Sequence, residues 1–411
     1  MSTTDLLSLL EERAAAGTGP VLARTRGSIV FDAGPEGAWT LLLERGTVRV
    51  QYGAIDDPTS TVAASLPVLR SVVEGTRSGI EAFLSGELTM RGSMALGLQM
   101  DGLFAAETRP AQFPRAGLTL AAGIRTAYLE AGPKDAPPVV LIHGLGATNG
   151  SMLPTLWDLA RDHRVIAPDL PGHGATEAVH DNYDAAFLGR WLSAFFDAVG
   201  AERPVLIGNS LGGRTALEAG LEYPDKVGGL VLLAPAVAFR KMRQFIPLVR
   251  RLNPRWASVP VPMTRRVAAA ELRHMFAVPE RISPAAYDAA VDEFMRVWKR
   301  RSSRVAFFCA LRSIYLDEAF GERGFWDRLP TLQTPALFVW GKRDRLVPAA
   351  FARHVAEALP HSETVVFPDC GHVPQFELPD ETHAYIRDFL QRLEGSRPQP
   401  GAHPVFEDMS A

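Results

Sequence analysis

Residues 204–223 read PVLIGNSLGGRTALEAGLEY and carry the most specific structural signal in the chain. A short apolar run leads into a glycine-flanked serine, and a helical pattern follows. This is the G-x-S-x-G pattern in the strand–turn–helix setting that it requires. The turn is so tight that only small residues fit beside the serine, which accounts for Gly208 and Gly212. We therefore expect Ser210 to stand exposed on a strained bend with the start of a helix behind it.

Outward from this turn, short apolar runs alternate with helical patterns along most of the chain. The runs are Val139–Ile142, Val165–Ala167, Val205–Ile207, Leu230–Leu233, Ala336–Trp340 and Thr364–Phe367. The helical patterns include Phe187–Val199, Leu211–Leu221 and Phe351–Leu359. Most of the runs lack polar alternation, as strands buried on both faces of a parallel sheet do. The pattern predicts a doubly wound, mostly parallel α/β sheet.

A serine at its ordinary pKa is a poor nucleophile and needs a base. His372, in the run CGHVP, follows the last apolar run, so it would sit on a loop at the carboxyl end of a strand. Asp344 lies in the turn after Ala336–Trp340 and is the candidate for the acid that orients His372. Asp169 also ends a strand, but it comes too early along the chain. The order Ser210, Asp344, His372 is the one expected for this architecture.

A developing oxyanion needs backbone N–H groups aimed at it. The run HGLG at 143–146 follows a strand, and its glycines let the backbone turn in closely. The N–H groups of Leu145 and of Leu211 are therefore the oxyanion-hole candidates. We expect His143 to hold this loop by a hydrogen bond, and His173 in the run DLPGHG to be structural as well. A lone motif of this kind often arises by chance, whereas four such elements in order, each at a strand end, indicate catalysis.

Residues from about 118 to 393 resemble the α/β-hydrolase family. The matching runs are HGLG at 143–146, DLPGHG at 169–174, GNSLGG at 208–213, WGKRDRLVP at 340–348 and CGHVPQFELP at 370–379. The resemblance implies a hydrolase, and Ser210 argues against the dehalogenase and epoxide-hydrolase branches, which carry an aspartate there. GNSLGG with CGHVPQFE is similar to the carbon–carbon hydrolases of aromatic breakdown. Those usually have Trp after the histidine, whereas Val373 stands here, which leaves ester hydrolysis ahead.

The N-terminal region carries a second resemblance. Residues 27–104 contain strand patterns joined by glycine turns, a helix that ends in Gly, a Gly86-Glu87-Leu88 strand and the apolar segment Met94–Phe104. This order resembles the sterol carrier (nonspecific lipid-transfer) family, a small α+β fold with an apolar tunnel for lipid. The Met and Leu side chains of the last segment would equally pack the domain's own core. Both explanations stay open.

The predicted organisation has four parts. Residues 1–107 form the sterol-carrier-like domain, 108–117 a linker, 118–394 the hydrolase domain, and 395–411 a Pro- and Gly-rich, disordered tail. The start of the chain lacks a basic region and carries acidic residues, so it does not fit a signal peptide. Its Leu6, Leu9 and Leu10 spacing predicts a short amphipathic helix.

Composition narrows the class of protein further. The chain has 411 residues, 47% of them hydrophobic and 22% charged, with a net charge of -3. This composition is globular, and without a basic excess we expect no nucleic-acid partner. Two cysteines cannot form a disulfide framework and fit a reducing compartment. With no apolar stretch of membrane-span length, we expect a cytoplasmic protein.

The interval 236–330 breaks the alternation of strands and helices. It is mostly helical and broken by prolines, as a lid inserted between two strands would be. It carries 18 Lys and Arg against 9 Asp and Glu, an excess of +9 within a chain of -3. Residues 239–252 mix apolar and basic side chains at helical spacing. One interpretation is a helix face that makes weak peripheral contact with a membrane or that faces an acidic substrate. The other is an ordinary solvated helix face.

The sequence therefore predicts a serine hydrolase with the triad Ser210, His372 and Asp344. The expected substrate is a small-molecule ester or thioester with an apolar or lipid-like part, and no metal or organic cofactor is implied. The first alternative is carbon–carbon bond hydrolysis by the same triad. The second is a lipid-binding carrier whose hydrolase part is a non-catalytic scaffold.

Overall fold

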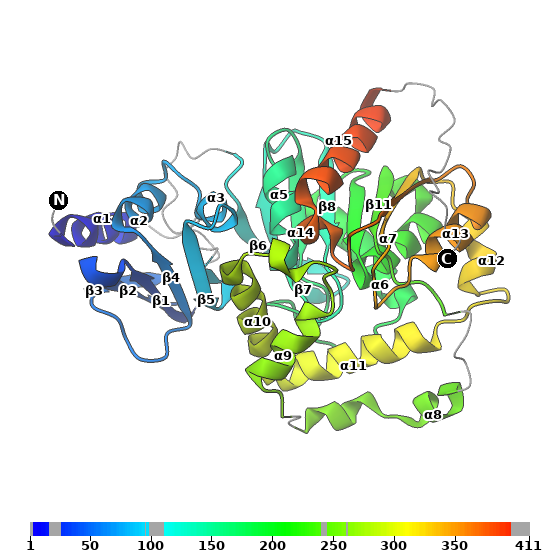
Figure 1. Cartoon of the computed structure of the whole chain (residues 1–411), viewed down its shortest axis with the longest axis horizontal. Helices are drawn as coiled ribbons and strands as arrows, with labels where there is room; N and C mark the ends of the chain where they lie inside the picture. The colour runs from blue at the N-terminus through cyan, green and yellow to red at the C-terminus, as the bar shows by residue number, and fades with distance from the viewer. Residues whose placement is uncertain are drawn as a thin grey trace.

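The computed structural model describes residues 3–15, 26–94, 96–97, 111–239, 245–259 and 262–395. These residues form two sheets, each in a domain of its own (Figure 1). The domain with the smaller sheet lies at the N-terminal end of the molecule, and the domain with the larger sheet makes up the rest of the described chain. Residues 396–411 of the predicted C-terminal tail and residues 108–110 of the predicted linker lie outside the described residues, whereas Gly395 ends helix α15 (Pro379–Gly395).

The N-terminal domain is a five-stranded sheet with helices along one side (Figure 1). Its strands are β1 (Arg26–Asp32), β2 (Ala38–Glu44), β3 (Thr47–Tyr52), β4 (Ser60–Ala64) and β5 (Leu88–Gly92), in the order β3-β2-β1-β4-β5. Its helices are α1 (Thr3–Ala15), the 3₁₀ turn η2 (Gly34–Glu36), α2 (Leu66–Glu74) and α3 (Gly79–Leu84). The predicted amphipathic helix is α1, which buries Leu6 and Leu10 in the domain core. Of the predicted segment Met94–Phe104, Met94, Leu96 and Gly97 are described, and the side chains of Met94 and Leu96 are buried in a core cluster that both domains share.

The larger domain contains an eight-stranded sheet in the order β13-β12-β11-β10-β8-β9-β7-β6. Its strands are β6 (Arg115–Ala121), β7 (Ile124–Ala131), β8 (Pro138–Ile142), β9 (Arg164–Pro168), β10 (Val205–Asn209), β11 (Gly229–Leu233), β12 (Ala336–Gly341) and β13 (Glu363–Phe367). All six apolar runs singled out in the sequence are strands, and they pair in parallel. The antiparallel strands β6 and β7 at the edge of the sheet were not among the predicted runs. Strand β6 begins at Arg115, three residues before position 118, the predicted start of the hydrolase domain.

Helices cover both faces of this sheet. They are α5 (Leu153–Leu159), α6 (Ala185–Val199), α7 (Leu211–Glu222), α13 (Ala350–Ala358), α14 (Pro374–Glu377) and α15 (Pro379–Gly395), with the 3₁₀ turns η3 (Asn149–Met152) and η4 (Pro224–Lys226). Strand β8 shows how the sheet is buried. Val139 and Leu141 belong to one core cluster with α5 and α15, whereas Val140 and Ile142 belong to the other with α6 and α7. Because successive side chains of a strand point to opposite faces, a doubly covered strand is apolar throughout.

Residues between β11 and β12 form a helical insertion (Figure 1). Its elements are α8 (Ile246–Arg251), η6 (Pro254–Ser258), α9 (Arg265–Arg273), η7 (Pro279–Arg281), α10 (Pro284–Lys299), α11 (Arg301–Leu316), α12 (Phe325–Arg328) and η8 (Leu329–Thr331). Prolines stand in the first turn of α8, η6, η7 and α10, where the missing N–H has no helical partner anyway. Pro247 therefore lies in the first turn of α8, which begins at Ile246.

The two domains meet where β5 lies against α10. The Asp292 carboxylate accepts from the Arg91 guanidinium at 2.6 Å and from the N–H of Gly92 at 3.3 Å. The neighbouring Glu293 accepts from the N–H of Met94 at 3.2 Å. The insertion is thus hydrogen-bonded directly to the N-terminal domain. In the part of the chain that the structure describes, no helix combines the length and apolarity needed to cross a membrane.

The turn between β10 and α7 depends on two glycines for steric reasons. A Cβ atom on Gly212 would lie 2.1 Å from the carbonyl oxygen of Ile142 and 2.6 Å from that of His143. A Cβ atom on Gly208 would lie 2.4 Å from the carbonyl oxygen of Gly212. These contacts involve backbone, which cannot rotate aside. The glycines therefore let α7 approach the end of β8 closely.

We expect Gly212→Ala to lower the free energy of unfolding by at least about 2 kcal/mol, because the added methyl group overpacks a backbone contact. Urea unfolding of the full chain measures this. Gly395→Ala is the control, since a Cβ there meets nothing within 4 Å. Equal stability of the two variants would contradict the steric explanation.

Candidate active site

Ser210 stands at the carboxyl edge of the large sheet, between β10 and α7. Its backbone has φ 54° and ψ -114°, a strained conformation for a residue with a side chain. Its N–H donates to the carbonyl of Leu233 at 3.0 Å, and its own carbonyl accepts from the N–H of Ala236 at 2.9 Å. The end of β11 thus holds the bend on both sides. The predicted strained turn is present.

His372 and Asp344 are joined by a short hydrogen bond. The Nδ1 atom of His372 lies 2.7 Å from Oδ2 of Asp344, and both side chains are buried. The other carboxylate oxygen of Asp344 accepts from the N–H groups of Leu346 and Val347, at 2.7 and 2.9 Å. The carboxylate is therefore fixed by backbone donors on one side and presents its second oxygen to the imidazole.

Asn209 connects the histidine loop to the serine turn. Its side-chain amide donates to the carbonyl of His372 and to the carbonyl of Leu233, each at 3.0 Å. On another side, a Cβ atom on Gly144 would lie 3.3 Å from the Cβ of Ser210. The loops that follow β8, β12 and β13 therefore converge on the turn that carries Ser210.

Two backbone N–H groups are available beside the serine. Leu211 is the first residue of α7, so its N–H has no acceptor within the helix. The hydrogen bond from the N–H of Ala147 to the carbonyl of Gly144 closes a turn with Gly146 at φ 74°. That turn bond leaves out the N–H of Leu145. The two predicted oxyanion-hole residues thus lie in the loop after β8, for Leu145, and at the start of α7, for Leu211.

His143 joins two loops and stays neutral. Its Nδ1 donates to the carbonyl of Gly144 at 2.8 Å, and its Nε2 accepts from the N–H of Leu170 at 2.9 Å. Burial lowers the pKa of His143 to about 3. Its Nε2 lies 4.0 Å from Asp169, but a nitrogen that accepts a hydrogen bond carries no proton, so the two do not form an ion pair. His143 holds the loop by hydrogen bonds, as predicted.

Asp169 holds two further loops together. One of its oxygens accepts from the N–H of Asn149 and the other from the N–H of Ala175, each at 2.8 Å. Burial raises the pKa of this carboxyl group to about 6. Both carboxylate oxygens are thus occupied by backbone donors, which fits the exclusion of Asp169 from the triad on chain order.

The insertion also holds the histidine loop. The N–H of His372 donates to the carbonyl of Met275 at 2.7 Å. Glu377, which is buried, accepts from the N–H of Gly371 at 2.7 Å and from that of Val278 at 2.6 Å. Burial and this carboxylate together raise the pKa of the Cys370 thiol. A shift of the insertion at 275–278 would therefore be felt at His372.

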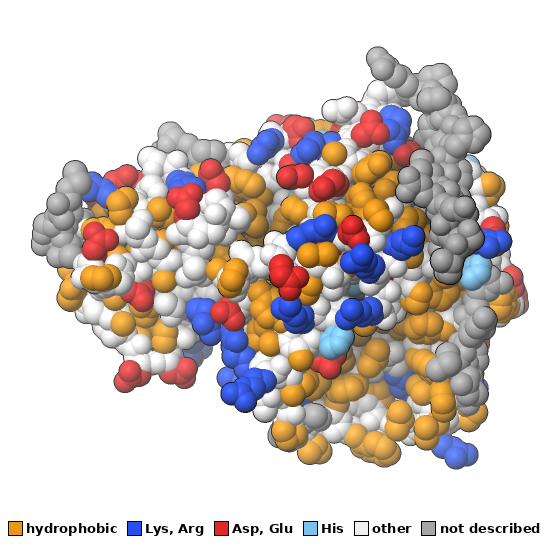
Figure 2. Space-filling view, viewed as in Figure 1, with side chains coloured by type: hydrophobic (Ala, Val, Ile, Leu, Met, Phe, Trp, Pro, Cys, Tyr) orange, Lys and Arg blue, Asp and Glu red, His pale blue; other side chains and the backbone are white. Residues whose placement is uncertain are grey.

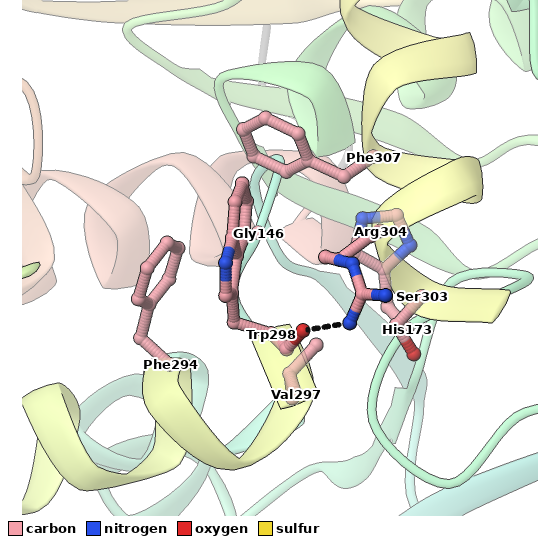
Figure 3. A pocket seen from close by; sticks show the side chains of 8 residues that line it. All are labelled: Gly146, His173, Phe294, Val297, Trp298, Ser303, Arg304 and Phe307. Carbon is pink, nitrogen blue, oxygen red and sulfur yellow. Dashed lines mark hydrogen bonds between the residues drawn. The ribbon is translucent and has the colours of Figure 1, made fainter. Parts of the chain in front are cut away.

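A small cavity lies between the HGLG loop, the loop of His173 and helices α10 and α11 (Figure 3). It is lined by Gly146, His173, Phe294, Val297, Trp298, Ser303, Arg304 and Phe307. Its volume of ≈ 10 Å³ has room for about one water molecule. Three aromatic rings form much of its wall.

The polar groups of the cavity are neutral or already bonded. The Arg304 guanidinium donates to four backbone carbonyls, at 2.9–3.2 Å, of residues 257, 258, 298 and 299. His173 donates from Nδ1 to the carbonyl of Pro171 at 3.0 Å, and burial lowers its pKa. Its buried Nε2 has no partner among the described residues. The cavity therefore presents aromatic surface, the neutral imidazole of His173 and the hydroxyl-bearing Ser303, and the charge of Arg304 is committed to the backbone.

No cluster of three or more His, Cys, Asp or Glu side chains in the described ranges could hold a metal ion.

The sequence located each of these side chains at a strand end, and the structure brings those strand ends together. The sequence motifs did not single out Asn209 or Glu377, although both residues lie inside the runs that resemble the α/β-hydrolase family. The cavity residues of α10 and α11 carry no motif. Their aromatic spacing is equally typical of a helix that packs in a core, so nothing in the sequence marks them.

Comparison with known proteins places this site in a family. Residues 137–379 match the model of the alpha/beta hydrolase fold. The chain therefore belongs to the alpha/beta hydrolase family. Residues 7–105 match the model of the SCP-2 sterol transfer family, which confirms the second resemblance.

Similar curated proteins span more than one activity. The chain is 31% identical over 267 residues to the dihydrolipoyllysine-residue acetyltransferase component of the acetoin cleaving system of Pseudomonas putida. That match covers 64% of this chain and 66% of the relative. It is 30% identical over 238 residues to a 2-hydroxy-6-oxononadienedioate/2-hydroxy-6-oxononatrienedioate hydrolase of Paraburkholderia phymatum, covering 56% of this chain and 76% of the relative.

Among solved structures, a membrane phospholipase A described as a bacterial virulence factor superposes with a TM-score of 0.59 at 25% identity, covering 80% of this chain and 97% of that one. A serine hydrolase involved in carbazole degradation superposes with a TM-score of 0.56 at 25% identity, covering 68% and 99%. An enol-lactonase of Burkholderia xenovorans, at 22% identity over 67% of this chain and 100% of that one, with a TM-score of 0.57, shares the fold.

The neutral state of buried His143 predicts sensitivity to acid. Its ordinary pKa of 6.5 falls to about 3 in the folded chain. Between these values the unfolded chain binds one more proton than the folded chain. This residue therefore lowers the free energy of unfolding by about 1.4 kcal/mol per pH unit as the pH falls from 6.5 toward 3. In urea unfolding between about pH 7 and about pH 5, the free energy of unfolding should change less steeply with pH for His143→Gln than for the wild type.

The raised pKa of Asp169 acts in the opposite direction, since its contribution is present at low pH and is lost as the pH rises through about 6. Only the difference in pH dependence between His143→Gln and the wild type therefore isolates the contribution of His143. The exposed His274 provides the control variant His274→Gln, which should keep the wild-type slope. An unchanged slope in His143→Gln would contradict the neutral assignment.

Proposed function

We propose that this protein is a serine hydrolase that cleaves an ester or thioester with an apolar or lipid-like part. The observation that carries the proposal is the strained Ser210 turn, linked through Asn209 to a loop whose His372 is hydrogen-bonded to Asp344. Strain at a non-glycine residue persists only where the surroundings impose it, and functional sites are where it gathers.

In the proposed mechanism, the Oγ of Ser210 attacks the carbonyl carbon while Nε2 of His372 takes its proton. Asp344 holds Nδ1 of the ring, which fixes the tautomer and stabilises the imidazolium that forms. The N–H groups of Leu145 and Leu211 donate to the oxyanion. Collapse of the tetrahedral intermediate breaks the ester bond, and His372 returns the proton to the leaving alcohol or thiol. Water, activated by His372 in the same way, then attacks the acyl-enzyme and releases the carboxylic acid product.

The cavity beside the HGLG loop supports an apolar substrate part. Phe294, Trp298 and Phe307 favour rings or alkyl chains, and Arg304 has its charge committed to carbonyls. A cavity of ≈ 10 Å³ is smaller than such a group, so entry requires α10 and α11 to move outward. We propose on this ground that the insertion acts as a lid.

Carbon–carbon bond hydrolysis is the second candidate, favoured by similar proteins named for dienedioate substrates. Such substrates carry two carboxylates, which require cations or several donors at the site. Among the residues that line the cavity, Arg304 is the one Lys or Arg, and it is bonded to backbone. Val373 also stands where those hydrolases usually have Trp. Ester cleavage therefore remains the first proposal.

Ser210→Ala should lower turnover of p-nitrophenyl esters by at least about 10³-fold, because the nucleophile is removed. It should also abolish labelling by a fluorophosphonate probe. Ser362→Ala is the control, since Ser362 lies at the opposite end of β13. Undiminished turnover in Ser210→Ala would remove Ser210 from the mechanism. A wild-type chain that the probe does not label would instead favour the carrier with a non-catalytic scaffold.

A panel of substrates separates the two hydrolytic candidates. It should contain p-nitrophenyl esters and acyl thioesters of increasing chain length, together with a meta-cleavage dienoate. We expect higher kcat/KM for apolar acyl groups, and Trp298→Ala should shift the preference toward bulkier ones, because it enlarges the cavity. Faster cleavage of the dienoate than of every ester would replace ester hydrolysis by the carbon–carbon reaction.

A further inference from the structure

The outer side of the insertion exposes a row of large apolar side chains. They lie in residues 245–259, which form α8 and η6 and are called the strap below. The exposed members are Phe245, Leu248, Leu252, Trp256 and Val259. Leu248 is 59% exposed, and Trp256 and Val259 are each 65% exposed. Single exposed apolar residues are common, but five within fifteen positions mark a surface that binds something.

The strap is held on the molecule through its backbone. The Arg312 guanidinium donates to the carbonyls of Val249 and Arg250, at 3.2 and 3.0 Å. Arg304 donates to the carbonyls of Ala257 and Ser258, at 3.0 and 3.2 Å. These anchors lie on α11, against the inner side of the strap. The apolar side chains consequently face solvent while the backbone is fixed. Figure 2 shows hydrophobic side chains gathered along the edge where α8 lies in Figure 1.

The charge of this surface has one sign. Within the strap, Arg250, Arg251 and Arg255 are exposed, and there is no acidic residue. The whole stretch 236–270 carries 8 Lys and Arg and no Asp or Glu, although the chain has a net charge of -3. Arginine and exposed Trp, Phe and Leu without any acid fit a surface that supplies both negative charge and an apolar layer. An anionic lipid bilayer supplies both.

A second copy of the chain fits less well. A twofold contact between two straps would bring the arginines of both copies into one interface, since an isologous interface uses the same patch on both subunits. Like charges would then meet with no acidic partner in either strap. We propose that the strap is a peripheral binding element for the surface of an anionic lipid membrane.

This placement goes beyond the proposed hydrolysis and connects the membrane to the cavity. Arg304 holds the strap from one side and lines the cavity on the other. A strap seated among lipid headgroups would set α11, and with it the cavity wall, beside a source of apolar molecules. Binding itself needs neither Ser210 nor the triad.

The test is vesicle flotation of the full chain. The vesicles are phosphatidylcholine alone, or phosphatidylcholine mixed with phosphatidylglycerol. We expect binding to the anionic vesicles that is at least tenfold stronger than to the neutral ones and that weakens with added salt. The emission of Trp256 should shift to the blue on binding, and Trp256→Phe should remove that shift.

Two double variants divide the apolar and electrostatic contributions. Arg250→Ser with Arg251→Ser should weaken binding about 25-fold, at about fivefold per arginine. Leu248→Ser with Trp256→Ser should weaken it at least tenfold, since two large side chains no longer enter the bilayer. The matched controls change exposed residues elsewhere: Arg125→Ser with Arg353→Ser, and Tyr52→Ser with Leu120→Ser. Both controls should bind as the wild type does.

Absence of flotation at low salt, equal binding to neutral vesicles, or unchanged binding of the strap variants would each overturn the proposal. So would a wild-type dimer in light scattering that the Leu248→Ser, Trp256→Ser variant converts to a monomer, because the strap would then be a protein interface. Ser210→Ala should float as the wild type does. A failure of the proposed hydrolysis is thereby distinguishable from a failure of membrane binding.

Discussion

The close approach of backbone to backbone around Ser210 is the constraint on which the rest of the structure depends. Gly208 and Gly212 have no room for a Cβ atom because the serine turn, the start of α7 and the end of β8 share one small space. Only there can a helix N-terminus, a strained serine and the HGLG loop meet. The parallel sheet serves this meeting, because it brings the carboxyl ends of its central strands to one edge.

Buried polar side chains then hold the loops that leave this edge. His143, Asp169 and Glu377 each bond to backbone groups of two different segments. None of them needs to exchange a proton to do so. A buried imidazole with a pKa near 3 remains neutral at neutral pH, and a buried carboxylate is tolerated where backbone N–H groups face both of its oxygens. The site is therefore rigid near the sheet.

The helical insertion contacts the N-terminal domain, the cavity and the histidine loop. Helix α10 is bonded to the N-terminal domain through Asp292 and Glu293, and its following residues Phe294 and Trp298 line the cavity. The segment before it holds the histidine loop through Met275. A displacement of this insertion would thus reach the sterol-carrier-like domain, the cavity and His372 together. This arrangement gives the fused N-terminal domain a physical route to the hydrolase site.

The strands of the parallel sheet, the strained turn, and the strand ends that carry the serine, acid and histidine could all be predicted from the amino-acid sequence. These features follow from local rules, since burial on both faces makes a strand apolar and a tight turn admits only glycine. Packing in three dimensions set the bond from Asn209 to His372 and the aromatic cavity wall. It also decided which side of residues 245–259 faces solvent. Such contacts join residues distant in the chain, and their side chains would look the same in a core or on a surface until packing assigns them a side.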